Sequence, residues 1–525
     1  MTEKRNFIMY RLILFGLILG LSFNLLTEVS EADNQRSGLI LNEAACAMIN
    51  DGHEPPKNLF LADSLWPMSH RNPYQQASSP YPGPYKTMSQ DHFTFLKGLP
   101  GVITIAFSGK YPDGSRAIWC SNQRVVFKAR FEDKRLVDVA KIKKEGFSWV
   151  DIINPDVGIS GAYVILDKDN TFFVPRFNKL YAYGDDVQGD PDSSIRLKGS
   201  FEIPKDELID EEEIIIGINL TYDGMIALVT NKGLVCVVSR TFDEVHYFRF
   251  GKDEEISNSI AIDEDNGIYV VTSKKMYRVQ WTGEKLTINE REGGWSADYE
   301  VGSDIAGVRL GVGSGSTPTL MGTGQQDKFV VITDGQRLMN IVLFWREKIP
   351  ADWKQISGTK DRRIAAQTSI TFGNREAKKS SSEQSVCIRG YGALVVNNEL
   401  NIDTDKRVWA IIRSGDPDVA PYGAEKFVWN PAKRELKSVW SNKEISFPNG
   451  IPCMSAATNL IYDVGQRNGT WTFEALDWDT GKSMFHYGIG KRFWYNSTWA
   501  ATAIGPYGTI NSGAFLGIMS AFPDK

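Results

Sequence analysis

The chain is 525 residues long and carries a formal net charge of -5 at pH 7. Aromatic residues make up 11% of it, alongside 47 glycines and 22 prolines, a composition that favours many short strands and tight turns over long helices. The acidic balance, without a stripe of Lys and Arg, excludes nucleic acid as an expected partner.

The N-terminus has the pattern of a secretory signal peptide. Basic residues, the last of them Arg11, precede an apolar run from Leu12 to Leu26, and small residues follow at Ser30 and Ala32. We expect residues 1–32 to be cleaved off, which predicts a secreted or periplasmic protein without a stable membrane span. The alternative is an uncleaved anchor, although the run of 15 residues is shorter than the roughly 20 that cross a bilayer.

Residues 33–100 are rich in Pro, Ser and Asn and include the Pro-rich run 80–84. This composition predicts an extended arm that runs over the surface of the folded domain and does not fold alone. His70 lies in this arm. It is a candidate catalytic general base if the arm crosses the mouth of a channel. The alternative is a structural histidine that holds the arm in place through hydrogen bonds.

Residues 101–525 repeat a loose pattern of apolar strands and short turns, several with an Asp-Gly or Asn-Gly pair. The two clearest copies, 222–238 and 265–279, are offset by 43 residues, a period typical of propeller blades. We predict an all-β fold, a single β-propeller of about seven blades, with six or eight as alternatives. Segment 497–522 is expected to close the ring by completing a sheet with strands from about residues 100–108.

Three stretches within the repeats stand out by composition. The acidic run 206–213 and the polar run 374–384 are interpreted as solvated loops. The Gly-rich stretch 311–318 lacks the Lys and the strand-to-helix context of a phosphate-binding loop, so we interpret it as a bulged inner strand or a tight loop.

Several common functional motifs are absent, namely a Walker A loop, HExxH, GxSxG and CxxC. The five cysteines are widely spaced and odd in number, which excludes a dense disulfide framework. Cys236 lies in an apolar run and is expected to be a buried strand residue. Three sequons begin at Asn219, Asn468 and Asn496 and would be glycosylation acceptors in a eukaryotic secretory pathway.

Short motifs late in the chain carry a family resemblance. Pro448–Ile451 followed by Leu460–Asp463 resembles the inner-strand motif of the gluconolactonase and strictosidine synthase superfamily. Ala475–Gly481 resembles the blade ending of pyrroloquinoline-quinone-type propeller repeats, and Trp66–Pro73 resembles their opening strand. Together these motifs cover about a tenth of the chain, and both resemblances imply a β-propeller.

The lactonase resemblance implies a metal site in the central channel. The motif asparagine, here Asn449, would bind a divalent cation such as calcium with its amide oxygen, and Asn258 stands in a comparable place. Such an ion could polarise an ester carbonyl. The carboxylates expected to complete the site are Asp151, Asp156 and Asp304. Alternatively, both asparagines cap turns or bond the backbone at the channel mouth.

Three functions follow from these patterns. The first is an exported module that binds a small-molecule or protein ligand on the propeller face, which fits the missing catalytic motifs. The second is a metal-dependent lactonase or esterase with its site in the channel. The third is a quinone-dependent oxidoreductase, although the adjacent cysteines that the quinoprotein resemblance implies are absent. The sequence leaves open whether the protein is an enzyme.

Overall fold

The computed structural model describes most of the chain outside the N-terminus. The described residues are 48–85, 92–98, 101, 103–122, 124–145, 161–302, 311–402 and 407–523. The predicted signal peptide, Cys46 and the three candidate carboxylates Asp151, Asp156 and Asp304 lie outside them.

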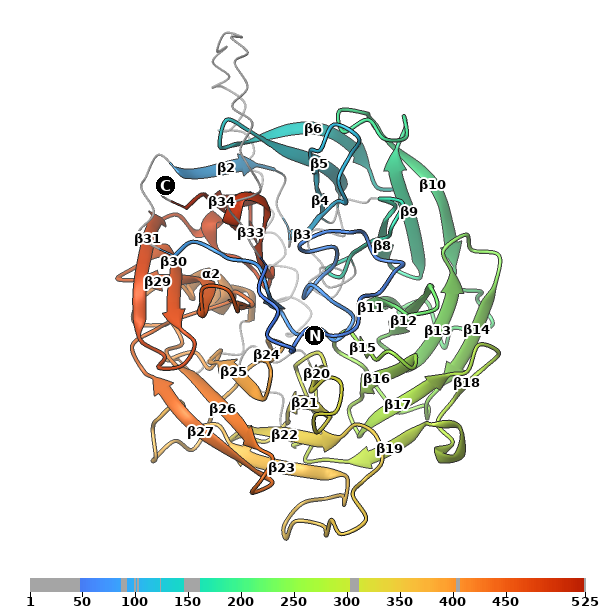
Figure 1. Ribbon diagram of the computed structural model, residues 1–525, viewed down its shortest axis with the longest axis vertical. Helices are drawn as coiled ribbons and strands as arrows, with labels where there is room; N and C mark the ends of the chain where they lie inside the picture. The colour runs from blue at the N-terminus through green and yellow to red at the C-terminus, as the bar shows by residue number, and fades with distance from the viewer. Residues whose placement is uncertain are drawn as a thin grey trace, which may run out of the picture.

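Eight small antiparallel sheets stand around a central axis as the blades of a propeller (Figure 1). We number the blades in chain order and give their strands from the channel outward. Blade 1 contains β3 (Thr104–Phe107), β4 (Ile118–Ser121), β5 (Val125–Glu132) and β6 (Arg135–Lys143); blade 2 contains β7 (Ile165–Leu166), β8 (Phe172–Arg176), β9 (Lys179–Asp185) and β10 (Ile195–Glu202); blade 3 contains β11 (Ile215–Leu220), β12 (Met225–Thr230), β13 (Leu234–Ser239) and β14 (Val245–Arg249); blade 4 contains β15 (Ala261–Ile262), β16 (Gly267–Val271) and β17 (Lys275–Trp281), with β18 (Leu286–Thr287) and β19 (Trp295–Asp298) both paired to β17.

The second half of the ring follows the same plan. Blade 5 contains β20 (Thr319–Met321), β21 (Phe329–Thr333), β22 (Asn340–Trp345) and β23 (Ile364–Ser369); blade 6 contains β24 (Cys387–Arg389), β25 (Gly392–Val396), β26 (Ala424–Asn430) and β27 (Glu435–Asn442); blade 7 contains β28 (Cys453–Ser455), β29 (Leu460–Arg467), β30 (Thr470–Asp477) and β31 (Ser483–Gly490); blade 8 contains β32 (Thr502–Ile504), β33 (Ile510–Ala514), β34 (Gly517–Ala521) and β2 (Phe93–Lys97). Within the described residues the helices are η4 (Glu290–Glu292), α2 (Arg407–Arg413), η5 (Phe493–Tyr495) and η6 (Pro506–Gly508).

The ring has one blade more than the seven predicted, and its closure explains the difference. The C-terminal strand β34 pairs with β2, in the register Phe93 to Ala521, and not with a strand at 100–108. That later segment forms β3, which opens blade 1. The predicted seven repeats therefore correspond to blades 1–7, and the eighth blade is built from the two distant parts of the chain. Because β2 near the N-terminus pairs with β34 near the C-terminus, the ring of blades closes without a gap.

The middle strands are buried on both faces because each blade packs between two others. All five residues from Leu234 to Val238 are fully buried, and fully burying a large apolar side chain contributes about 1.5–3 kcal/mol. Cys236 lies within this run, as predicted. It is one of four described cysteines, all buried and free, the others being Cys120, Cys387 and Cys453.

The arm enters the ring instead of running over its surface. Backbone N–H groups of six blades donate to carbonyls of arm residues 66–77, and the segment lies across the ring centre in Figure 1. These bonds run from Phe107 to Trp66 (2.8 Å), Leu166 to Pro67 (2.8 Å), Ile262 to Pro73 (2.8 Å), Leu320 to Tyr74 (2.9 Å), Ile388 to Gln76 (3.0 Å) and Met454 to Ala77 (3.0 Å). Strand β1 (Ser78–Ser79) then pairs in parallel with β28. The arm thus satisfies inner-strand backbone groups that face the channel.

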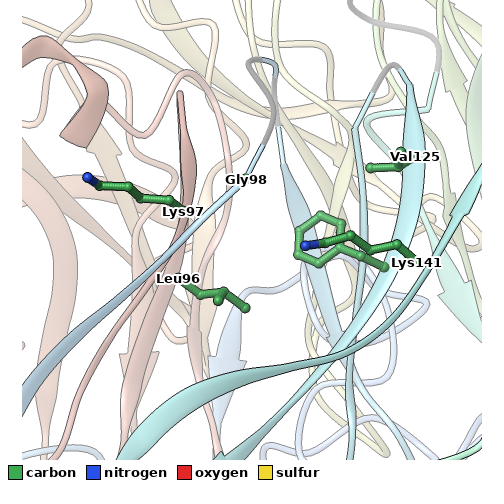
Figure 2. Close-up of a pocket in the computed structure, with 6 residues that line it drawn as sticks. Leu96, Lys97, Gly98, Val125 and Lys141 are labelled. Carbon is green, nitrogen blue, oxygen red and sulfur yellow. The ribbon is translucent and has the colours of Figure 1, made fainter. Parts of the chain in front are cut away.

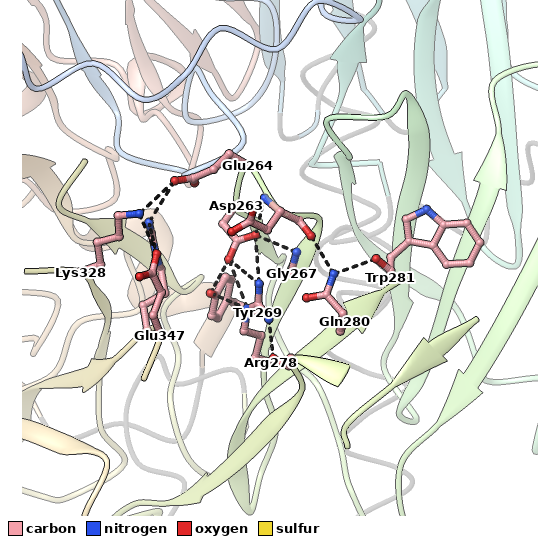
Figure 3. Close-up of polar contacts among 12 residues, drawn as sticks. Asp263, Glu264, Gly267, Tyr269, Arg278, Gln280, Trp281, Lys328 and Glu347 are labelled. Atoms are coloured by element: carbon pink, nitrogen blue, oxygen red, sulfur yellow. Dashed lines mark hydrogen bonds and ion pairs between the residues drawn. The ribbon is translucent and has the colours of Figure 1, made fainter. Parts of the chain in front are cut away.

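A cluster of polar side chains on blade 4, shown in Figure 3, includes Glu264, which contacts the arm. Tyr74 donates its hydroxyl hydrogen to Glu264. In the adjacent Asp263, Oδ2 accepts from the Tyr269 hydroxyl at 2.6 Å and from Arg278 Nη2 at 3.0 Å. Burial raises the pKa of Tyr269 far above its ordinary value, so its hydroxyl stays protonated and donates.

An ionic clasp fixes the start of the arm to blade 6. Arg389 binds both Asp51, through Nε at 2.9 Å, and Glu54, which also accepts from Arg71 Nη2 at 2.6 Å. The Arg389 side chain is 3% exposed, whereas those of Asp51 and Glu54 are 27% and 28% exposed. One buried guanidinium therefore joins two acidic residues of the arm to the inner strand of a blade.

Replacing the clasp arginine is expected to weaken the fold. Arg389→Gln removes the arginine partner of Asp51 and one of the two arginine partners of Glu54, and should lower the free energy of unfolding by about 2 kcal/mol. Lys57→Gln is the control, because Lys57 and Asp63 form an exposed pair, 67% and 86% exposed, and should cost below about 0.5 kcal/mol. Urea unfolding of both variants measures the difference; equal, small losses would mean that the clasp does not anchor the arm.

Candidate ligand site at the channel mouth

Polar residues precede the inner strands of five successive blades. Inner strands run in one direction along a propeller channel, and the parallel bridge between Ile451 and Ala501 shows this for blades 7 and 8. Their starts therefore meet at one end of the channel. We call the following segments the mouth residues: Ser257–Ser259, Ser314–Thr317, Ser381–Ser385, Ser446–Asn449 and Asn496–Trp499. The six backbone bonds given above join arm carbonyls to the middle and final residues of the inner strands.

Hydrogen bonds link these segments from blade to blade. Asn258 donates to the carbonyl of Gly315, and Thr333 donates to Ser316 Oγ at 3.1 Å and lies 3.4 Å from the carbonyl of Ser382. Asn398 of blade 6 donates to the carbonyl of Pro448 at 3.1 Å. The mouth residues of blades 4 to 7 thus form a connected set.

Helix α2 completes the connection to blade 8. Asn449 Nδ2 donates to Ser414 Oγ, just after the helix, at 2.5 Å and to Asn496 Oδ1 at 3.0 Å. Asn496 in turn donates to the carbonyl of Ile411 at 3.0 Å. This helix lies between β25 and β26 in the sequence of blade 6.

Many buried side-chain atoms at the mouth lack a hydrogen-bond partner among the described residues. Gln384 is 1% exposed, yet both its amide nitrogen and its oxygen are unpartnered. More than nine in ten buried polar groups in proteins are hydrogen-bonded, which makes such a concentration unusual. The other unpartnered atoms are Ser381 Oγ, Ser382 Oγ, Ser446 Oγ, Ser497 Oγ, Thr498 Oγ1 and Trp499 Nε1. These atoms offer donors and acceptors to a bound molecule.

Three contacts beside this set involve Tyr163 of blade 2 and His70 of the arm. Tyr163, which precedes the inner strand of blade 2, lies with its hydroxyl 3.0 Å from Thr317 Oγ1 of blade 5. His70 of the arm places Nε2 3.4 Å from Ser385 Oγ, and its ring centroid lies 5.9 Å from that of Tyr163. The arm therefore reaches the mouth residues at His70.

His70 is neutral at ordinary pH. It is 1% exposed, and burial lowers its pKa to about 4. Its Nδ1 has no partner among the described residues, so no carboxylate orients the imidazole. Nucleophile, base and orienting group normally form a chain of hydrogen bonds. His70 and Ser385 supply the first two positions of such a chain without the third.

Asn258 and Asn449, the predicted cation ligands, lie in the mouth on blades 4 and 7. Their amide nitrogens are engaged by neighbouring residues, and in the described part of the chain no hydrogen bond joins the two side chains. Across the described ranges, no group of three or more His, Cys, Asp or Glu residues is placed to hold a metal ion. A cation shared by these asparagines stays a prediction.

The sequence interpretation passed over Asp463, a fully buried acid next to the mouth. Its Oδ1 accepts from Thr502 Oγ1 and from the backbone N–H of Val464, both at 2.8 Å, while Oδ2 has no partner among the described residues. Burial raises the pKa of Asp463 to about 8, so the carboxyl is protonated at neutral pH. A Cβ at Gly450 would lie 2.1 Å from this Oδ1, which explains the glycine after Asn449. In the sequence, the sign that could have identified Asp463 is an acidic residue within an otherwise apolar strand.

The sequons differ in accessibility. Asn219 is fully buried and donates to the carbonyls of Pro73 in the arm, at 3.0 Å, and Ile260, at 2.8 Å. Asn496 is 2% exposed. Asn468 is exposed in the turn between β29 and β30. Of the three, only Asn468 could receive a glycan without disturbing a buried contact.

A cavity of about 240 Å³ lies away from the mouth, where blades 8 and 1 meet (Figure 2). Its wall is largely apolar, with Leu96 from β2 and Val125 and Phe127 from β5, and two lysines, Lys97 and Lys141, stand beside it. It brings together no acid, base or nucleophile pair, and we assign it no chemistry.

No helix within the described residues is long and apolar enough to cross a membrane. No family model matches the chain. Similar solved structures include the C-terminal WD40 domain of Sif2, with 9% identity, a TM-score of 0.46 and coverage of 89% of this chain and 99% of that one. Another is a europium-containing methanol dehydrogenase, with 12% identity, a TM-score of 0.47 and coverage of 87% and 90%. Neither likeness bears on function, so the resemblance to quinoprotein and lactonase propellers stays a prediction.

A relative of known sequence is an uncharacterized protein of Archaeoglobus fulgidus. The two chains are 47% identical over 479 residues, which cover 89% of this chain and 88% of the relative. At that identity over nearly the whole of both, the present chain belongs to the same protein family as the A. fulgidus protein.

Proposed function

We propose that this protein is an exported binding module that holds a small polar molecule at the channel mouth. The observation that carries the proposal is the set of buried, unpartnered hydroxyl and amide atoms on blades 6 to 8, with Gln384 among them. A ligand that supplied their missing partners would gain affinity, because leaving a buried polar group unpaired costs about 1–3 kcal/mol. Concave sites that present a few convergent polar groups are the usual form of small-molecule sites.

Binding is favoured over hydrolysis by the state of His70. The 3.4 Å contact between its Nε2 and Ser385 Oγ is the closest approach to a nucleophile and base pair at the mouth. A base with a pKa of about 4 draws a proton from a hydroxyl weakly. Without an orienting carboxylate on Nδ1, the imidazole is better suited to hydrogen bonding with a ligand or with Ser385.

The binding site is tested by removing the amide of Gln384. A panel of neutral and charged small molecules is screened by thermal shift, and the affinity of any that raise the melting temperature is measured by calorimetry. Gln384→Met keeps the side-chain length but removes donor and acceptor, and should weaken binding at least tenfold. Gln355→Met, on an exposed loop of blade 5, should leave it unchanged. Stabilising ligands indifferent to Gln384→Met would refute a site at the mouth.

Export is tested separately. If residues 1–32 form a cleaved signal peptide, protein recovered from outside the cytoplasm should begin at Asp33, as read by N-terminal sequencing. The control is the variant Leu17→Arg, which breaks the apolar run and should keep the protein in the cytoplasm. Full-length chains starting at Met1 and held in the membrane fraction would instead support the anchor alternative.

A further inference from the structure

The segment from Trp494 to Trp499 carries four unpartnered polar atoms on four different residues. Ser497 Oγ, Thr498 Oγ1, Trp494 Nε1 and Trp499 Nε1 are all buried and have no hydrogen-bond partner among the described residues. Ser497 is fully buried and Thr498 is 7% exposed. Four such atoms within six residues exceed what a well-packed loop leaves unpaired.

The same segment has a strained backbone that its neighbours hold in place. Thr498 and Trp499 have φ angles of 46° and 64°, in the left-handed region that residues other than glycine seldom adopt. Asn496 Oδ1 accepts from the N–H of Thr498 at 2.9 Å, and the N–H of Trp499 donates to the carbonyl of Asn449 at 2.9 Å. Strain of this kind costs about 1–3 kcal/mol per residue and is found at ligand sites.

The chemistry of the segment points to a neutral ligand rich in hydroxyl groups. An indole N–H only donates, so Trp494 and Trp499 require acceptor oxygens, whereas the hydroxyls of Ser497 and Thr498 both donate and accept. A sugar hydroxyl can meet either need. Trp499 as a residue is partly exposed, and its indole offers an apolar face of the kind on which the C–H face of a sugar ring can pack.

Charged groups near the segment are already engaged. Arg492 lies over the Trp494 ring, 4.4 Å from its centroid. Arg413, at the end of α2, pairs with Asp416 and lies 4.7 Å from the Trp409 ring centroid. The segment itself carries no ionisable side chain other than the Tyr495 phenol. An anionic ligand would therefore lack a dedicated cation here.

We propose that the segment from Trp494 to Trp499 binds a neutral saccharide, with Trp499 packing on the sugar ring and donating Nε1–H to one of its oxygens. This inference rests on the proposed function, because it names the ligand class of the channel mouth. The sugar would lie on blade 8, beside Asn449 and Asn496. The strained backbone would hold the indole of Trp499 and the hydroxyls of Ser497 and Thr498 toward the ligand.

Tryptophan fluorescence tests the assignment directly. The probes are glucose, galactose, mannose, N-acetylglucosamine and their β-linked disaccharides, with glucuronate and glucose 6-phosphate as charged comparators. At least one neutral probe should quench the fluorescence saturably. Trp499→Phe keeps an aromatic ring but loses the donor and should weaken that binding about tenfold, and Thr498→Val should weaken it about fivefold.

Trp353→Phe provides the matched control. Trp353 Nε1 is also buried without a partner among the described residues, but this indole packs on Trp345 in blade 5. The control should bind the neutral probe as the unmodified protein does, and equal melting temperatures confirm that all variants fold. Neutral binding that Trp499→Phe and Thr498→Val leave intact would refute the site.

The outcomes separate this inference from the proposed function. Binding confined to the charged comparators, and weakened by Gln384→Met, would overturn the saccharide while keeping the mouth as a ligand site. If no neutral sugar binds but another small molecule does, and Gln384→Met weakens the binding of that molecule, the saccharide is likewise overturned and the mouth remains a ligand site. No Gln384-dependent ligand of any kind would overturn both.

Discussion

Asp463→Asn is expected to stabilise the protein increasingly as the pH rises from about 4 to about 8. The folded-state pKa of Asp463 is raised from its ordinary 3.8 to about 8 by burial. Between those values the folded state holds a proton that the unfolded state has released, so stability falls with rising pH. The loss amounts to about 1.4 kcal/mol per pH unit as an upper bound. Asparagine does not titrate, and its amide can still accept from Thr502.

The comparison between variant and unmodified protein isolates this one group, because other titrating groups are common to both. Urea unfolding at pH 4, 6 and 8 should give nearly equal stabilities at pH 4 and a gap of several kcal/mol at pH 8. Asp113→Asn, at an exposed turn before β4, controls for the loss of a carboxylate in general. A gap that stays constant across the pH range would show that Asp463 is ionised in the folded state.

The propeller could be predicted because its repeating signal is local. Tight hairpin turns need residues with positive φ, and Gly224 and Asn266, at 95° and 62°, supply them in the two clearest repeats. The blade number could not be read in the same way. Pairing of β2 with β34 joins residues more than 400 positions apart in the chain. The sequence of neither strand indicates which strand it pairs with.

The site was predicted in part for a related reason. The resemblance led to Asn449 and Asn258, which do lie at the mouth, but Ser and Gln are usually exposed. The run 374–384 was therefore interpreted as a solvated loop, whereas Ser380–Gln384 are buried. That burial arises because several blades converge with the arm on one narrow channel. No local sequence pattern predicts that these segments meet, so the hydroxyl-rich mouth is found only from the three-dimensional structure.

Trp66→Ala is expected to remove about 3–5 kcal/mol from the free energy of unfolding. Trp66 lies in the arm yet is fully buried, in the apolar core shared by blades 6, 7, 8 and 1. Its carbonyl also accepts from Phe107 at the end of β3. An arm that merely covered the surface would tolerate truncation of this side chain, whereas an arm that forms part of the core leaves a large cavity.

Two further variants sharpen that test. Trp66→Phe keeps most of the apolar volume and should cost about 1–2 kcal/mol. Leu59→Ala removes an arm side chain that is 72% exposed and should cost below about 0.5 kcal/mol. Urea unfolding of the three should rank them in that order. A loss below about 1 kcal/mol for Trp66→Ala would mean that this part of the arm contributes little to the stability of the core.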